Sequence, residues 1–359
     1  MLPLAAALVV LIPTPTWAIE EFYSRHLYPW VQNGVTFLSN LLPVALIDLF
    51  ILAAVALVVL RVVRLAGRAK REGLPAAAWE SAQRLLRAAA VLLLLFMSIW
   101  GCHYRRSPLE AALEDVDQPT TALLVSVIGK ANGLAASLRP GVQGQPQMSY
   151  DETSRRLVAP MAAALRDLDL EPLARAGRPK HSFILTPFFT WAGVNGMINP
   201  LALESIVHPG LLPVERPFVL AHEWAHLAGL ADESEASAVG WLACMRGEPA
   251  LAYSASIYLI MEAAAALPGE AWRQASAKLD EGVRADIRTI LERMRQQQKP
   301  QVQRAAFRVY DGYLKANRVE DGTASYGRAL SLILSPKLRG ALEGYGGVTR
   351  KPDPSGSGG

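Results

Sequence analysis

The chain has 359 residues, of which 51% are hydrophobic and 19% are charged, and its formal net charge is +4. This composition is too apolar for an ordinary soluble protein and too polar for a transporter built from many membrane helices. Seven basic and two acidic residues lie between Arg61 and Arg87, a balance of +5 that leaves about −1 for the rest of the chain. The positive charge is therefore confined to one short segment and does not indicate binding to nucleic acid.

Two segments are predicted to cross a membrane as helices. Residues 41–60 contain Asp48 as their only charge, and residues 85–102 contain only Arg87, close to one end. Each segment approaches the roughly 20 apolar residues that a helix needs to cross the hydrocarbon core. Basic residues beside such helices prefer the cytoplasm, so the loop 61–84 is predicted to be cytoplasmic and the chain after the second span extracytoplasmic. The sequence thus indicates a multi-pass protein of the bacterial cytoplasmic membrane, with the lipid bilayer as one partner.

Residues 3–18 form a third apolar segment, which is either a short span or a signal peptide cleaved at its end. The segment lacks a basic start, and Pro13 and Pro15 interrupt it. Both features favour a retained span over a signal peptide. Residues 1–102 are therefore assigned to the membrane region.

Residues 103–350 are predicted to form one soluble domain, and the Pro-, Gly- and Ser-rich tail 351–359 is predicted to be disordered. Most of the domain has a helical pattern, but aromatic and β-branched residues with glycine turn signals predict strands within residues 181–200. The two cysteines, Cys102 and Cys244, are predicted to form no disulfide bond. The expected fold class is α+β and helix-dominated, with N-terminal transmembrane helices and a small sheet beside one central helix.

That central helix, predicted within residues 218–230, carries the motif HExxH with His222, Glu223 and His226. Residues four apart lie on the same face of a helix, so both imidazoles can bind one Zn²⁺ ion. The zinc lowers the pKa of its bound water, and Glu223 is placed to take a proton from that water as the general base. The motif predicts a zinc-dependent hydrolase.

The third zinc ligand is predicted among three acidic residues that follow the motif. Asp232 completes the spacing HExxHxxGxxD, but Asp232 and Glu235 also form a D-x-x-E capping box for the next helix. Under that interpretation Glu233, in the first turn of this helix, faces the metal. The spacing favours Glu233 and leaves Glu235 and Asp232 as alternatives.

Peptide hydrolysis by zinc also needs a hydrogen-bond donor for the developing oxyanion. We predict this role for Tyr326 and Arg328, which lie together in one Tyr-Gly-Arg segment. Tyr253 and His208 are alternatives. An edge strand within residues 191–199 is predicted to pair with an extended substrate.

Two further acids, Asp48 and Glu204, receive structural interpretations. Asp48 lies within about two helical turns of the outer end of its predicted span, which favours a solvated or hydrogen-bonded helix-end aspartate over a functional intramembrane acid. Glu204 is interpreted as an acid on a helix surface rather than as a neighbour of the metal. Neither is predicted to take part in catalysis.

Several short groups of residues, spread along most of the chain, carry a resemblance to a known family. They are Glu21–Ser24, Tyr28–Pro29, Pro43, Asp48, Trp100–Gly101, Tyr104, Arg106, Pro108, the HExxH helix with Gly229, Glu233–Ala236, Tyr253–Ser254, Tyr313–Lys315 and Ser325–Arg328. In these positions the chain resembles a family of bacterial membrane proteins of unknown function with a zincin-like zinc-peptidase domain. The resemblance implies membrane helices followed by a zincin-like external domain, and it favours Glu233 or Glu235 over Asp232. Ser237 departs from the family, which tends to have Asn there, so a hydrogen bond to a zinc-bound histidine is expected to be weaker.

These features together predict a membrane-anchored zinc metallopeptidase that cleaves extracytoplasmic proteins or peptides. The alternative is a non-catalytic, membrane-tethered binding or sensory module that keeps zinc for structure. Intramembrane proteolysis is not favoured, because the motif helix has too little apolar sequence around it to cross a bilayer. No feature of the sequence indicates nucleic acid as a partner.

Overall fold

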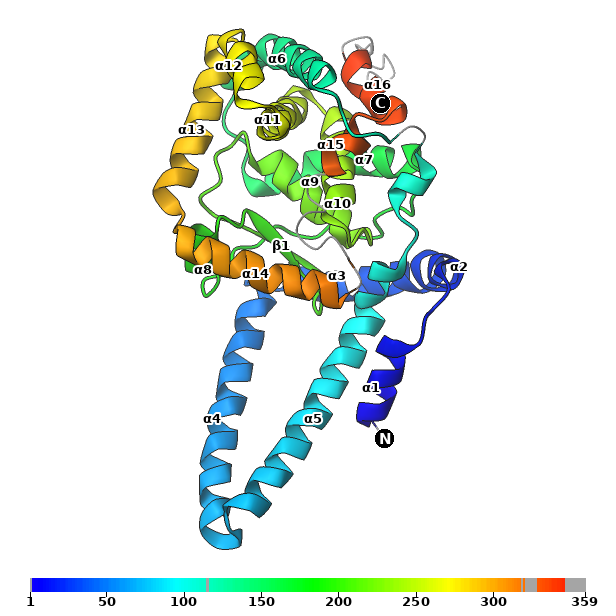
Figure 1. Ribbon diagram of the computed structural model, residues 1–359, viewed down its shortest axis with the longest axis vertical. Coiled ribbons are helices and arrows are strands. Elements are labelled where there is room, and N and C mark those ends of the chain that lie inside the picture. Colours follow the sequence, from blue (N-terminus) through cyan, green and yellow to red (C-terminus); the bar gives the residue numbers. More distant parts are fainter. Residues whose placement is uncertain (1, 114–115, 318, 320–327, 346–359) are drawn as a thin grey trace, which may run out of the picture.

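The computed structural model describes residues 2–113, 116–317, 319 and 328–345. Figure 1 shows a rounded helical body from which two long helices, α4 (Leu46–Glu72) and α5 (Leu74–Ile99), extend side by side. The two helices meet at Gly73, which adopts a positive φ of 86° at the tight turn. This arrangement separates an elongated apolar part from a compact part that holds the HExxH helix.

The N-terminal helices begin beside α5 and then turn toward the body. Helix α1 (Leu2–Leu11) lies against α5, and the short α2 (Thr16–Ala18) leads into the π-helix η1 (Ile19–Leu27) and α3 (Tyr28–Leu41). The chain bends by 113° between α1 and the helices that follow. Prolines in the intervening residues remove backbone donors and prevent one continuous helix through residues 3–18.

Four helices among the described residues are long and apolar enough to cross a membrane, or five if the bent N-terminal pair counts as one span. Only 6% and 11% of the apolar windows of α4 and α5 are buried within the protein. The other two helices, α6 (Thr121–Gln143) and α11 (Pro249–Ala266), pack against each other inside the body. Most of the apolar surface of α4 and α5 is therefore without protein cover, as expected for membrane helices.

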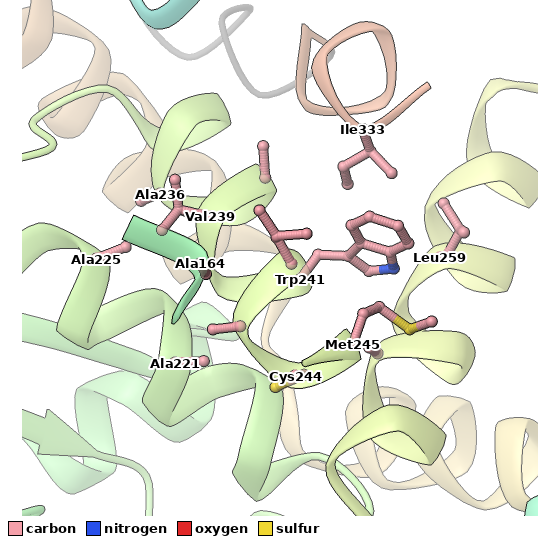
Figure 2. Packing of buried hydrophobic residues seen from close by; sticks show 14 of the residues in the cluster. Ala164, Ala221, Ala225, Ala236, Val239, Trp241, Cys244, Met245, Leu259 and Ile333 are labelled. Atoms are coloured by element: carbon pink, nitrogen blue, oxygen red, sulfur yellow. The ribbon is translucent and has the colours of Figure 1, made fainter. Parts of the chain in front are cut away.

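Helices make up nearly all of the regular secondary structure in the body. Besides α6 and α11 it contains η2 (Gly101–Arg105), η3 (Leu109–Ala112), α7 (Tyr150–Asp167), α8 (Thr186–Ala192), β1 (Gly196–Asn199), β2 (Glu204–Val207), α9 (Arg216–Leu227), α10 (Glu233–Met245), α12 (Gly269–Ala277), α13 (Glu281–Gln297), α14 (Pro300–Ala316), α15 (Ala329–Ile333) and α16 (Pro336–Gly344). Helix α10 lies at the centre, in contact with α7, α9, α11 and α15. Its fully buried Trp241 lies among Met245, Leu259 and Ile333 (Figure 2). Burying a side chain of this size stabilises a fold by about 2–3 kcal/mol or more.

The small sheet consists of β1 and β2, paired antiparallel with Gly196 opposite Val207. Both strands contact α9, so the prediction of a helix-dominated fold with a small sheet beside the HExxH helix is confirmed. Within residues 181–200, however, the prediction of strands was wrong for the aromatic part, which forms α8. Pro187 occupies the first turn of α8, and Gly193 ends the helix with a left-handed φ of 76°. Phe189 is buried, whereas Phe183, Phe188 and Trp191 are exposed, so these aromatic residues do not alternate across a sheet.

Helix α3 is joined to the body by buried hydrogen bonds between side chains and distant carbonyl groups. The hydroxyl of Tyr28 donates to the carbonyl of Leu227 at 2.9 Å, and the hydroxyl of Thr36 donates to the carbonyl of Leu203 at 2.9 Å. Residues before and after the predicted boundary at Cys102 therefore share one packed core.

The start of α4 is capped by the body. Glu204, which is 1% exposed, accepts hydrogen bonds from the backbone N–H groups of Leu46 and Ile47 at 3.0 and 2.9 Å. It also forms a buried ion pair with Lys180 at 2.9 Å. The interpretation of Glu204 as a surface acid was wrong, because a distant helix end needs a buried acceptor that local sequence cannot reveal. Asp48 is a hydrogen-bonded helix-end aspartate as predicted, accepting from the backbone N–H of Phe183 at 2.8 Å.

Candidate metal centre

Helix α9 places the two histidines of the motif on one face, one turn apart. The helix ends in a Schellman turn, in which the N–H of Leu230 bonds the carbonyl of Ala225 at 3.2 Å while Gly229 adopts a φ of 92°. This turn brings the carbonyl of Leu230 to 2.6 Å from Nδ1 of His226. A local feature of the sequence, a glycine directly after the helix, thus fixes the orientation of one imidazole.

Helix α10 supplies the third side chain of the cluster. Asp232 is its N-cap, accepting hydrogen bonds from the backbone N–H groups of Ser234 at 2.9 Å and Glu235 at 3.3 Å. Glu233 therefore starts the first turn and faces α9. The two helices approach closely at Gly240, where an added Cβ would lie 2.8 Å from the backbone nitrogen of His222. Only glycine permits this approach.

The three donor atoms lie at the spacing that a zinc ion requires. Nε2 of His222 lies 3.1 Å from Nε2 of His226 and 3.1 Å from Oε2 of Glu233, and the third side of the triangle, between His226 and Glu233, measures 3.4 Å. Zn–N and Zn–O bonds of about 2.0–2.1 Å at tetrahedral angles place ligand atoms about 3.3–3.4 Å apart. The residues present therefore fit Zn²⁺, with three protein ligands and one position left for water or substrate.

The hydrogen bonds around the histidines also favour a cation between them. A carbonyl oxygen only accepts, so Nδ1 of His226 must carry the proton that it donates to Leu230. In a neutral imidazole this leaves the lone pair of Nε2 facing the carboxylate of Glu233, an arrangement that needs either a metal ion or a second proton. Nδ1 of His222 lies 3.2 Å from the hydroxyl of Ser237.

Without a metal, protonation of His226 supplies the positive charge. Burial lowers the pKa of His226, but the Glu233 carboxylate outweighs this effect and raises it to about 9. Burial would raise the pKa of Glu233, yet the neighbouring His226 and His222 hold it well below its ordinary value. The pair is thus an imidazolium and a carboxylate at neutral pH, and a divalent cation would displace the imidazolium proton.

Glu223 lies next to this cluster and is almost fully buried. Its Oε2 has no hydrogen-bond partner among the described residues, and burial raises the pKa of its carboxyl to about 8. Its Oε1 lies against β1 at Gly196, where an added Cβ would approach it to 2.5 Å. An unpartnered buried carboxylate oxygen beside a metal cluster is the feature expected of a base that waits for a water molecule.

The other predicted ligands have structural partners. Glu235 accepts a hydrogen bond from the backbone N–H of Leu109 at 2.6 Å, and Asp232 caps α10. Among the described residues, the only group of His, Cys, Asp and Glu side chains close enough to share a metal ion is His222, His226 and Glu233. The structure thus brings Glu233, and not Glu235 or Asp232, to the histidine pair.

The predicted oxyanion donors lie elsewhere or outside the described residues. Tyr326 belongs to the part of the chain that the structure does not describe. Arg328 forms an ion pair with Asp232 at 2.9 Å, so its guanidinium supports the cap of α10. Tyr253 bonds Asp286, and His208 lies 2.8 Å from the hydroxyl of Thr190.

Sequence reasoning missed Tyr310 of α14, whose hydroxyl donates a hydrogen bond to Oε1 of Glu233. This bond leaves Oε2, the oxygen that faces both histidines, available to a metal. The only signal in the sequence is a pair of tyrosines three residues apart, Tyr310 and Tyr313, on an amphipathic helix. That pattern is more typical of helix packing, so no local feature connected α14 with the motif.

A pocket of about 510 Å³ opens beside the first turn of α10, and neither His222 nor His226 lines it. Its lining is strongly charged and includes Arg106, Asp117, Asp232, Glu235 and Arg328. Arg106 pairs with Glu20 at 3.1 Å. The pocket thus lies next to the residues that hold α10 in place.

The fold and the cluster define a helix-dominated protein with apolar helices long enough to cross a membrane and an HExxH-type group of possible metal ligands. The chain belongs to the family described as protein of unknown function (DUF3810), whose sequence model matches residues 23–334. The match covers α3, α4 and α5 as well as all three residues of the cluster. Neither a curated protein nor a solved structure matches the chain.

Proposed function

We propose that this protein is a zinc-dependent peptidase anchored in the bacterial cytoplasmic membrane, acting on extracytoplasmic proteins or peptides. The observation that carries the proposal is the triangle of donor atoms at tetrahedral-edge distances, with the unpartnered oxygen of Glu223 beside it. Structural zinc sites use four protein ligands, whereas catalytic sites use three and keep one position open. The cluster supplies three.

Zn²⁺ held by His222, His226 and Glu233 would supply Lewis acidity toward a carbonyl oxygen and would lower the pKa of water. Oε2 of Glu223 takes a proton from the water molecule that attacks the peptide carbonyl. The same carboxyl then gives this proton to the leaving amine. Burial raises its pKa to about 8, and the positive charge of a bound Zn²⁺ would lower that pKa toward neutrality. A pKa near neutrality suits a group that must both accept and return a proton. Tyr310 acts as a positioning residue, because its hydrogen bond fixes the rotation of the Glu233 carboxylate.

Strand β1 supports the peptide as substrate class. Within the described residues β1 pairs with β2 alone, so its other edge has no strand partner. An extended peptide could add to such an edge. Gly196, at the start of the strand, lies directly against Glu223. A peptide bound along this edge would pass the general base.

The test is zinc stoichiometry and peptide hydrolysis by the full-length protein in detergent or nanodiscs. Wild type and Glu223→Gln are expected to hold about one zinc per chain, and His226→Ala is expected to hold none. Glu223→Gln should lose at least about 10²-fold in activity, the typical contribution of a general base. Glu270→Gln serves as the control, because that glutamate is exposed on α12 and lies outside the proposed metal site.

Zinc binding without dependence of activity on Glu223 would contradict the mechanism. A protein that keeps zinc, cleaves no peptide, and unfolds when His226 is changed would instead be the tethered binding or sensory module. A folded wild type that binds no zinc would overturn both alternatives.

A further inference from the structure

A group of large apolar side chains is exposed on the body at the segment that leads into and through α8. Phe183 is 81% exposed, and Ile184, Phe188 and Trp191 are 39%, 41% and 40% exposed. Contiguous exposed apolar surface on a folded body marks a contact with another protein or with a membrane. The neighbours of this segment decide between the two.

This segment is held at the level where the helix α4 begins. Asp48, in the first turn of α4, accepts hydrogen bonds from the hydroxyl of Ser182 and from the backbone N–H of Phe183. The side chain of Phe183 therefore extends from the point where the uncovered apolar surface of α4 starts. If α4 crosses a bilayer, Phe183 cannot lie far from its surface.

Helix α14 has an apolar stripe that continues this surface toward α5. The stripe consists of Val302, Ala305, Val309, Tyr313 and Ala316, at intervals of 3, 4, 4 and 3 residues that keep them on one side of a helix. The ring of Tyr313 lies 6.5 Å from that of Phe96, in the last turn of α5, so the stripe faces the end of that helix. Val309 is 75% exposed.

The two apolar groups belong to one face of the body. Helices α8 and α14 contact each other, and the ammonium group of Lys299 lies 3.8 Å from the centre of the Trp191 ring. Figure 1 shows α8 and α14 at the base of the body, on the side from which α4 and α5 extend. The face thus lies beside the ends of both long helices.

Basic residues run along another side of α14. Arg304, Arg308 and Lys315 are exposed and lie four and seven residues apart, on one flank of the helix. Helices that lie in a membrane interface combine an apolar side with lysines and arginines that reach lipid headgroups. Each such basic residue near an anionic surface contributes about 1 kcal/mol to binding.

We propose that this face, the segment 183–191 and the apolar stripe of α14, rests in the interfacial layer of the bilayer that α4 and α5 cross, with Arg304, Arg308 and Lys315 on anionic headgroups. The continuity of the face with both long helices identifies the bilayer as the occupant. Helix α14 then lies between lipid and the cluster, because Tyr310 on its inner side bonds Glu233. The metal centre is about one helix diameter, roughly 10 Å, from the membrane surface.

The test places nitroxide labels on the full-length protein in nanodiscs of phosphatidylcholine and phosphatidylglycerol. Cys102→Ser gives the background, because the remaining Cys244 is fully buried. Phe183→Cys and Val309→Cys probe the face. Glu281→Cys, at the start of α13, and Glu270→Cys, on α12, are exposed controls outside the proposed face.

We expect the labels at positions 183 and 309 to be several-fold more accessible to oxygen, which concentrates in lipid, than to a water-soluble nickel chelate. The two controls should show the reverse. Equal nickel accessibility at all four positions would overturn the proposal. Spin–spin broadening at position 309 that disappears on dilution with unlabelled protein would also overturn it, since the face would then contact a second copy of the chain. Neither readout depends on zinc or on peptidase activity, so the result is independent of the proposed function.

Discussion

The imidazole of His226 lies between two acceptors: the carbonyl of Leu230 at Nδ1 and the carboxylate of Glu233 at Nε2. The Leu230 bond keeps a proton on Nδ1, so Nε2 is the nitrogen that a metal could bind in exchange for its proton. Tyr310 then fixes Glu233 in turn. The centre is organised by these supporting hydrogen bonds as much as by the motif itself.

Replacement of Tyr310 by Phe is expected to weaken zinc binding by about 10- to 100-fold, the usual effect of removing a group that orients a ligand. The fold should be unchanged, because the ring remains. The measurement is competition with a fluorescent zinc chelator. Tyr313→Phe, on the same helix, is the matched control, since Tyr313 bonds Tyr104 and not the cluster. Equal zinc affinity in both variants would show that the Tyr310 bond has no role in metal binding.

Glu235 is expected to make the stability of the protein depend on pH. Burial raises the pKa of its carboxyl to about 7, from an ordinary value of 4.5. The folded state thus holds the proton more tightly than the unfolded state, and stability decreases as the pH rises from about 4.5 through 7. Glu235→Gln keeps an acceptor for Leu109 and should remove this part of the decrease, roughly 3 kcal/mol at pH 8. Thermal unfolding of both proteins between pH 4.5 and 8 measures it, and parallel curves would contradict the assignment.

At the scale of elements, the contact between α9 and α10 determines whether the cluster can form. Asp232 starts α10 one residue before Glu233, and Gly240 allows the two backbones to approach. Glycine within a helix normally costs about 0.5–1 kcal/mol relative to alanine, so its presence here reflects the close approach.

Gly240→Ala is therefore expected to force α10 away from α9 by several tenths of an ångström and to reduce zinc affinity at least tenfold. The alanine would favour an isolated helix, so lower affinity can be attributed to the helix contact and not to helix propensity. Gly312→Ala, on α14, is a control because its added Cβ meets no atom within 4 Å. Unchanged zinc affinity in Gly240→Ala would mean that the helices adjust without disturbing the ligands.

An element or a contact could be predicted from the sequence when the residues that produce it lie close together along the chain. His222, Glu223 and His226 share one helix, so spacing alone places them together. The choice of Glu233 over Glu235 depended on Asp232 being the N-cap of α10. The sequence indicated this cap but not the direction in which the side chain of Glu233 points. The contact of Tyr310 joins residues 77 apart, and no periodic pattern contains that information.

At the scale of the whole molecule, the body and the long helices α4 and α5 are joined by buried polar contacts. Glu204 and Asp48 connect the start of α4 to the body, and Tyr28 connects α3 to the end of α9. The orientation of the His222, His226 and Glu233 cluster relative to α4 and α5 is thus fixed by the fold and not by a flexible linker.

This fixed orientation leads to a prediction about substrates that rests on both the proposed peptidase activity and the proposed membrane contact. A peptide tethered to the same bilayer by a lipid anchor should be cleaved at least about tenfold faster than the same peptide in solution, because the tether raises its effective concentration at the centre. Cleavage rates in liposomes with tethered or untethered peptide measure the ratio. A ratio of one would mean that substrates reach the centre from the aqueous side.

The capping of α4 by Glu204 has a consequence for how the protein is made. Glu204, the acceptor for the first N–H groups of α4, is synthesised 158 residues after Leu46. Leu227, whose carbonyl accepts a hydrogen bond from Tyr28, is synthesised 199 residues after Tyr28. The membrane helices therefore enter the bilayer before their partners exist, and folding of the body closes long loops onto a template already inserted there, which slows folding. The cluster of His222, His226 and Glu233, supported by Tyr310 of α14, is complete only when this late step ends. The proposed peptidase activity is therefore expected to be absent from newly made chains until the body has closed onto α4 and α5.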